Sequence, residues 1–104
     1  MKRALLLILI SMPLPAQAEA TKQEICKVVG DMAENVMTHR QGGSKMSDML
    51  RVYGEELVAV PAAVEQISKL TLLAFEQPLF STEESKREAV IEFRNNAELG
   101  CFKS

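Results

Sequence analysis

Hydrophobic residues recur at steps of three and four along most of the chain beyond residue 20, and this spacing is typical of amphipathic helices. The first helix is predicted over about residues 21–40. Its main apolar stripe consists of Ile25, Val28, Val29, Met32 and Val36. A flanking apolar row consists of Cys26, Val29, Ala33 and Met37. His39 and Arg40 fall in the last turn, where positive charge suits the helix dipole. Gly42 or Gly43 then supplies the left-handed residue that ends many helices.

A second and a third helix are predicted after the two glycines. Ser44 is expected to be the N-cap of the second helix, which ends at Gly54. Its apolar positions are Met46, Met49, Leu50 and Tyr53. Residues 55–60 fit either a loop or an early helical turn, and Pro61 suits the first turn of the third helix. This third helix is expected to be the most buried one, because its apolar positions are Val64, Ile67, Leu70, Leu72, Leu73, Ala74 and Phe75.

The last helix carries the clearest start signal in the chain. Ser81 as N-cap and Glu84 three residues later form the pattern of a capping box. Apolar positions follow on one face at Val90, Phe93 and Ala97, and the same step then reaches Cys101. Gly100 is expected to close the helix. Since no segment alternates long enough to predict a strand, the expected fold is all-α, a small up-down bundle of three to four helices.

Cys26 and Cys101 are predicted to form one disulfide that closes this bundle. In an up-down bundle, an even number of helices places these two points at the same end. An odd number would separate them by about 30 Å, the length of a 20-residue helix. The loop-closure entropy of a ring of about 75 residues corresponds to about 4–5 kcal/mol. Two free thiols or a metal-binding pair are the alternatives, which the lack of a Cys-x-x-Cys spacing disfavours.

Residues 1–18 have the organisation of a signal peptide. Lys2 and Arg3 precede a short apolar run at residues 4–10, and Ala16-Gln17-Ala18 matches the small-x-small pattern of a cleavage site. The run is shorter than the roughly 20 residues that span a bilayer, so we expect no membrane anchor after processing. Cleavage near Ala18 would leave one helical domain, residues 19–104, in the periplasm or secreted. An uncleaved apolar helix is the alternative.

Processing also changes the charge balance. The 104-residue chain becomes one of 86 residues, which suffices for a single domain. It keeps ten of its twelve basic residues and all fourteen acidic ones, so its net charge is −4. This mildly acidic balance argues against nucleic acid as a partner, and equally against electrostatic binding to anionic membranes.

Residues suited to catalysis are scarce. His39 is the only imidazole, and there is no tryptophan. The nearby residues that a triad would need are Ser44, Ser47 and Asp48. A triad is defined by geometry, however, and serines at helix corners usually act as caps. Adjacent carboxylates occur at Glu55-Glu56 and Glu83-Glu84, without the aromatic residues of a sugar-binding cleft. We therefore expect neither an enzyme nor a cofactor.

The corner between the first two helices is the candidate binding site. Thioethers beside His39 suit Cu(I), but most of these methionines fall at apolar-stripe spacing and are expected in the core, so no metal site is predicted. Methionine side chains are also common on surfaces that bind varied apolar partners. If the first two helices splay apart, the methionines at their junction would be exposed. The candidate partner-binding residues are Met37, His39, Arg40, Gln41, Met46 and Met49. Ordinary core packing beside a solvated helix end is the alternative.

Four features together resemble a group of small exported helical proteins from bacterial and tailed-phage genomes. They are the early Cys26, the corner Arg40-Gln41-Gly42-Gly43 before a methionine-containing helix, the stretch Ala74-Phe75-Glu76-Gln77-Pro78, and a last helix ending in Cys101. An aromatic commonly precedes the final cysteine in that group, whereas this chain has Leu99-Gly100. The resemblance implies the fold and the export, and no particular activity.

The function expected from these features is the binding of another protein, as an inhibitor, an immunity factor or an accessory subunit. A small stapled core without catalytic groups motivates this expectation. The first alternative is a periplasmic stress chaperone that exposes apolar surface at low pH, motivated by the acidic balance and the methionine-rich corner. The remaining alternative is a protein without enzymatic activity and with neither of these roles.

Overall fold

The first helix begins where a threonine and a glutamate cap each other. The computed structural model describes residues 20–104, and the predicted signal peptide lies outside these residues. Helix α2 (Lys22–Gln41) starts after Thr21, whose hydroxyl accepts a hydrogen bond from the Glu24 backbone N–H at 3.1 Å. The Glu24 carboxylate accepts one from the Thr21 backbone N–H at 3.0 Å in return. These bonds lower the pKa of Glu24 and fix the start of α2.

Three further helices follow, with boundaries that differ slightly from the predicted ones. Their bounds are α3 (Met46–Glu56), α4 (Pro61–Phe75) and α5 (Glu83–Lys103). The N-caps are Lys45 and Thr82, each one residue later than predicted, and the Thr82 hydroxyl accepts from the Ser85 N–H at 3.1 Å. Gly54 and Gly100 lie inside α3 and α5, because a glycine ends a helix only where the chain also turns. The turn is made at Gly43, which has a φ of +89°.

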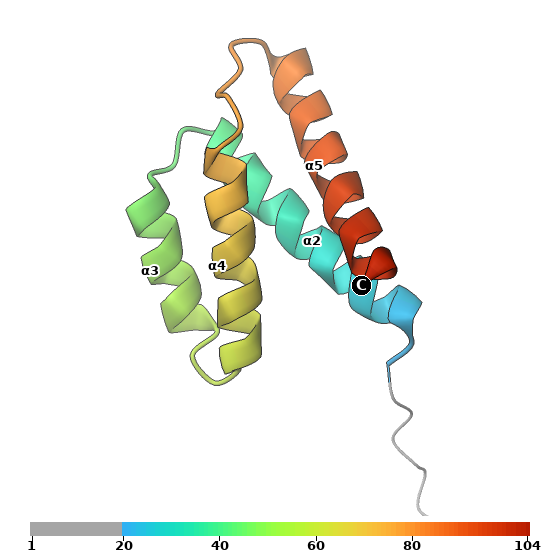
Figure 1. Cartoon of the computed structure of the whole chain (residues 1–104). Helices are drawn as coiled ribbons and strands as arrows, with labels where there is room; N and C mark the ends of the chain where they lie inside the picture. Colours follow the sequence, from blue (N-terminus) through green and yellow to red (C-terminus); the bar gives the residue numbers. More distant parts are fainter. Residues whose placement is uncertain (1–19) are drawn as a thin grey trace, which may run out of the picture.

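The four helices run alternately up and down, and α2 occupies the middle (Figure 1). Helices α4 and α5 both pack against α2, and α3 packs against α4. Helices α4 and α5 make little contact with each other. Over residues 20–104, the predicted all-α up-down bundle is therefore confirmed, with four helices, but its arrangement leaves α4 and α5 apart.

The disulfide between Cys26 and Cys101 is present and joins the start of α2 to the end of α5. The two Cα atoms are 5.5 Å apart, and the bond closes a separation of 75 residues. The even number of helices places both cysteines at one end, as predicted. A disulfide is consistent with an oxidising, exported location. Among residues 20–104, no helix has the length and apolar character needed to cross a membrane.

The buried face of α2 is the row that the sequence pattern assigned to the flank. Cys26, Ala33 and Met37 are buried together with Gly30, whereas Ile25 and Val28 of the predicted main stripe are half exposed. This row is the buried one because its small residues let α5 approach closely. A Cβ atom built on Gly30 would lie only 2.7 Å from the Glu98 side chain of α5. The prediction of the main stripe was therefore wrong for the first half of α2, where close packing of α5 selects the other row.

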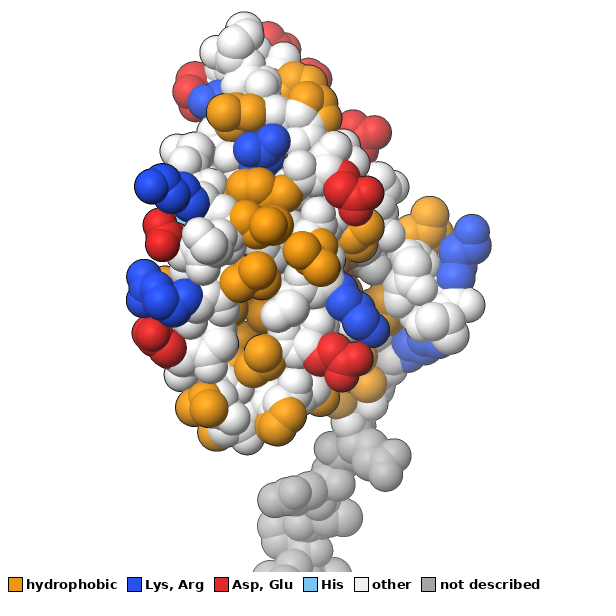
Figure 2. Space-filling view, turned by 60° about the vertical axis from the view of Figure 1, so that its left-hand side comes forward, with side chains coloured by type: hydrophobic (Ala, Val, Ile, Leu, Met, Phe, Trp, Pro, Cys, Tyr) orange, Lys and Arg blue, Asp and Glu red, His pale blue; other side chains and the backbone are white. Residues whose placement is uncertain are grey.

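Helix α2, and not α4, is the most central helix. In α4 the residues buried against the core are Ile67, Leu70, Thr71 and Ala74. Leu72 and Leu73 are 50% and 51% exposed, so the prediction of α4 as the most buried helix was wrong. Hydrophobic side chains accordingly gather on the surface of the α3 and α4 side of the molecule, with charged side chains along its edges (Figure 2). An apolar stripe can only be covered on the sides where a neighbouring helix packs.

Candidate functional site

The six candidate partner-binding residues do not form one surface. Met37, Gln41 and Met49 are buried, Arg40 is half-buried, and His39 and Met46 are exposed. Met37 and Met49 belong to the main core cluster, together with Val36 and Tyr53. The corner therefore does not splay into an open methionine groove. Met37 and Met49 contribute to the packing between helices, whereas Arg40 and Gln41 contact a distant loop.

Arg40 and Gln41 hold the loop that connects α4 to α5, residues 76–82. The side-chain amide of Gln41 donates to the Pro78 carbonyl at 2.9 Å and accepts from the Phe80 N–H at 3.0 Å. The Arg40 guanidinium donates to the Gln77 carbonyl at 3.0 Å and lies 4.7 Å from the centre of the Phe75 ring. Gln41 is only 3% exposed, so its amide supplies the partners that this loop backbone would otherwise take from water.

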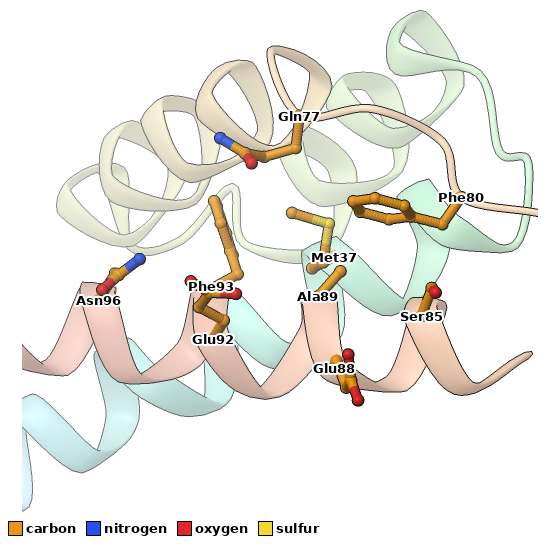
Figure 3. A pocket seen from close by; sticks show the side chains of 9 residues that line it. All are labelled: Met37, Gln77, Phe80, Ser85, Glu88, Ala89, Glu92, Phe93 and Asn96. Atoms are coloured by element: carbon orange, nitrogen blue, oxygen red, sulfur yellow. The ribbon is translucent and has the colours of Figure 1, made fainter. Parts of the chain in front are cut away.

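The 76–82 loop, held by Arg40 and Gln41, places Phe80 next to the end of α2 and opposite α5. In the close view, Phe80 and Phe93 lie on either side of the Met37 thioether, while Glu88 points away from them on α5 (Figure 3). The hollow that they line has a volume of about 200 Å³. Met37, a core residue of α2, therefore forms the floor of a surface depression between the loop and α5.

A second hollow continues the first one along the gap between α4 and α5. It has a volume of about 250 Å³ and shares Gln77, Phe93 and Asn96 with the first hollow. The residues specific to it are Leu70, Leu73, Glu76 and Ala97. We refer to the two hollows together as the α4–α5 groove, whose apolar lining is Met37, Leu70, Leu73, Phe80, Ala89, Phe93 and Ala97.

The ionisable residues of the α4–α5 groove are all acidic. Glu76 lies on the α4 side, and Glu88 and Glu92 lie one turn apart on α5. Neither lysine, arginine nor histidine lines either hollow. Within residues 20–104, none of the three glutamates takes part in an ion pair. The groove therefore combines an apolar floor with an uncompensated negative rim.

The basic residue in the middle of α5, Arg94, is engaged with α2 instead. Its guanidinium donates to Asp31 at 2.7 Å and to Glu34 at 2.8 Å, and it lies 3.5 Å from Glu98. Arg94 is only 21% exposed. The hydrogen bond from Arg94 lowers the pKa of Asp31, and Lys27 adds to the effect. The Asp31 carboxylate raises the pKa of Arg94 in turn. This cluster fastens α5 to α2 and contributes no positive charge to the groove lining.

His39 lines a different hollow, which lies between α2 and α3 and has a volume of about 470 Å³. Ser44 and Asp48 line the same hollow, but no hydrogen bond joins the three side chains in the described part of the chain. Nearby, the Tyr53 hydroxyl donates to Asn35 at 2.6 Å, and burial together with repulsion from Glu56 raises the pKa of this phenol. Over residues 20–104, no three His, Cys, Asp or Glu side chains are grouped to hold a metal ion.

Comparison of the chain with protein families, with curated proteins and with solved structures gave no significant match. The resemblance to exported bacterial and phage proteins therefore stays a prediction, and the site is argued from its geometry. Sequence reasoning identified Met37, Arg40 and Gln41 but missed Phe80, Phe93 and the glutamate rim. The signal that was available is the spacing of Glu84, Glu88 and Glu92 at steps of four, beside the Ser85, Ala89 and Phe93 face of the same helix.

Proposed function

We propose that this protein is a small exported helical protein that binds another protein through the α4–α5 groove. The observation that carries the proposal is the gap between α4 and α5, which both pack on α2 and leave Phe93 half-buried between them, beside the buried Met37. In the interior of a domain, such a gap would be filled by a further helix. Such a protein could act as an inhibitor, an immunity factor or an accessory subunit, since each of these binds another protein.

The groove is held in shape from both ends, which favours binding. The disulfide joins α2 to α5 at one end, and Gln41 fixes the 76–82 loop at the other. A site that is already ordered loses less conformational entropy on association and therefore binds more tightly. The α3 and α4 surface of Figure 2 is also apolar, but neither the disulfide nor the Gln41 hydrogen bonds fasten α3.

The test places a photoactivatable amino acid at exposed positions of the protein, produced with its own leader in the native host. Phe80 and Leu73 line the groove, and Val58, which is 72% exposed between α3 and α4, is the matched control. We expect the same covalent adduct from Phe80 and Leu73 and none from Val58. Equal labelling of all three positions, or no adduct at either groove position, would contradict the proposal.

A second candidate function is that of an acid-stress chaperone, and the Arg94 cluster is the observation that favours it. Protonation of Asp31 would remove one of the two carboxylates that bind Arg94 across the α2–α5 contact. Loosening of this contact would expose Val90 and Phe93, which pack against the core. Hydrophobic-dye fluorescence that rises as the pH falls below about 4 would support this function, and a flat response would exclude it.

A further inference from the structure

We propose that the occupant of the α4–α5 groove is a basic amphipathic helix of the partner protein. This inference rests on the proposed function and adds the chemistry of the partner. The occupant would place apolar side chains on the floor of the groove and Lys or Arg side chains against its rim. It would complete a four-helix arrangement with α2, α4 and α5, in the position where α4 and α5 do not meet.

The size of the groove fits a short helix. Its lining on α5 extends from Ser85 to Ala97, which corresponds to about 18 Å, or three helical turns. The two hollows lie on either side of the shared Phe93, one next to Ala89 and one next to Ala97. These positions are about 12 Å apart along the axis, a distance that two anchors at i and i+7 or i+8 of a helix would span. Each hollow is smaller than the roughly 300–1,000 Å³ of a small-molecule site.

Charge selects a basic helix. Glu88 and Glu92 follow one edge of the groove, and Glu76 stands on the other side. None of them is neutralised by a basic residue in the described chain, and Arg94 is committed to α2. A helix flanked by Lys or Arg would gain opposite charges along both edges. An acidic or anionic occupant would meet like charge at every rim position.

The middle of the groove is polar, and this sets the pattern of the helix that fits it. Gln77 from the loop and Asn96 from α5 project toward the space around Phe93 (Figure 3). Their side chains form no hydrogen bond within residues 20–104. Each amide can both donate and accept, so a polar side chain between the two apolar anchors would find partners here. The expected motif is therefore apolar, polar, apolar over about eight residues, with basic flanks.

A second copy of this chain is a poor occupant. The mature chain carries a net charge of −4, and the exposed apolar residues of α5, Ile91, Leu99 and Phe102, lie on a helix with five glutamates. Two copies in this geometry would bring carboxylates of one copy against the glutamate rim of the other. Binding of a second copy is therefore an outcome that would contradict the inference.

The test uses two designed 15-residue helical peptides with leucine anchors at i and i+7 and a glutamine between them at i+4, one flanked by lysines and one by glutamates. The full disulfide-bonded protein is titrated with each peptide, and binding is located by amide chemical shifts. We expect the lysine peptide to bind on the order of tenfold or more tightly than the glutamate peptide, with shifts at Phe80, Phe93 and Ala97. Raising NaCl from about 50 mM to about 300 mM should weaken binding, since the rim charges are exposed.

Charge reversal provides the matched control. In the double variant Glu88→Lys and Glu92→Lys, we expect the preference between the two peptides to reverse. The pair Glu83→Lys and Glu84→Lys, at the start of the same helix and outside the groove lining, should leave the preference unchanged. Both variants change the charge equally, and their folding is checked by the thermal melt of the oxidised protein.

Three outcomes would overturn the inference. They are equal binding of the two peptides, the same shift in preference for both charge variants, or self-association of the protein through the groove. If a partner adduct still forms at Phe80 and Leu73 in any of these cases, the proposed protein-binding function stands and only the chemistry of the occupant is wrong. If the adduct is also absent, the function falls as well.

Discussion

Gln41 at the end of α2 and Pro78 in the α4–α5 loop are joined by a hydrogen bond of 2.9 Å across 37 residues of chain. The other end of the same amide accepts from the Phe80 N–H. The buried amide of Gln41 thus forms hydrogen bonds with both a carbonyl and an N–H group of the loop backbone. The position of the whole 76–82 loop, and with it one wall of the groove, depends on this amide.

Replacement of Gln41 by Leu should destabilise the protein by about 1–3 kcal/mol, because the Pro78 carbonyl and the Phe80 N–H lose their partner. Chemical denaturation of the oxidised protein measures the change. Gln23→Leu, at an exposed position of the same helix, should stay within about 0.5 kcal/mol of the parent. Equal stability of the Gln41 variant and the parent would show that the loop does not need this anchor.

Removal of the disulfide by the double substitution Cys26→Ser and Cys101→Ser should lower the free energy of unfolding by about 4–5 kcal/mol. The reason is the entropy that the unfolded chain regains when a 75-residue separation is no longer closed. The same loss should appear when the parent protein is melted in the presence of reductant. If reductant shifts the melting temperature of the parent and of the double variant alike, the effect does not come from this bond.

Acid should weaken the junction of α2 and α5 through Asp31. The pKa of Asp31 is lower in the folded protein, because Arg94 and Lys27 bind its charged form. Its contribution to stability is therefore complete above the ordinary aspartate pKa of about 3.9 and is lost as the pH falls from there through the lower folded value. The stability difference between the parent and Asp31→Asn should therefore shrink as the pH falls below about 4.

The ion pair between Glu65 and Lys69, both in α4, provides a matched control for Asp31. Glu65→Gln removes an ion pair with Lys69 in which both side chains are about 70% exposed, and such pairs contribute little. The Glu65 variant should follow the parent closely at every pH. An Asp31 variant with the same behaviour would show that the Arg94 cluster does not stabilise the fold.

The helical glycines should respond differently to alanine. Gly100 and Gly54 have open space where a Cβ would stand, so Gly100→Ala and Gly54→Ala should each stabilise the protein by about 0.5–1 kcal/mol. Gly30→Ala should show no such gain, because its Cβ would displace Glu98 and disturb the Glu98 contact with Arg94. Thermal melts of the three single variants compare them directly. If Gly30→Ala stabilised the protein as much as Gly100→Ala, the Glu98 side chain would be able to move aside at little cost in free energy.

The helices and the disulfide could be predicted because both depend on local or countable features. The step of three to four defines each helix, and two cysteines in the chain allow a single intramolecular bond. The buried face of α2 could not be chosen in the same way. Two apolar rows compete there, and the decision depends on Gly30, whose lack of a side chain gives no hydrophobic signal but permits the close approach of α5.

The groove was harder to foresee than the fold. Met37 and Gln41 are among the predicted partner-binding residues, yet their roles depend on a loop that begins 35 residues after Gln41. Phe80 lies between two helices, so it belongs to no hydrophobic repeat in the sequence. The conformation of its loop depends on the distant side chain of Gln41, and the loop sequence itself gives no sign of this contact. The rim glutamates resemble an ordinary solvated helix face until the space beside them is known.

The positions of the two cysteines also determine how the protein would respond to a protease. All three interhelix connections lie between residues 27 and 100, inside the covalent ring that Cys26 and Cys101 close. A single cut at the exposed Val58, for example, would separate the helix pairs in sequence but leave both fragments linked through sulfur. The nicked protein would keep its parent mass, plus one water, until it met a reductant. Cleavage in an oxidising compartment would thus leave α2 and the α4–α5 pair, which together form the groove, on one molecule.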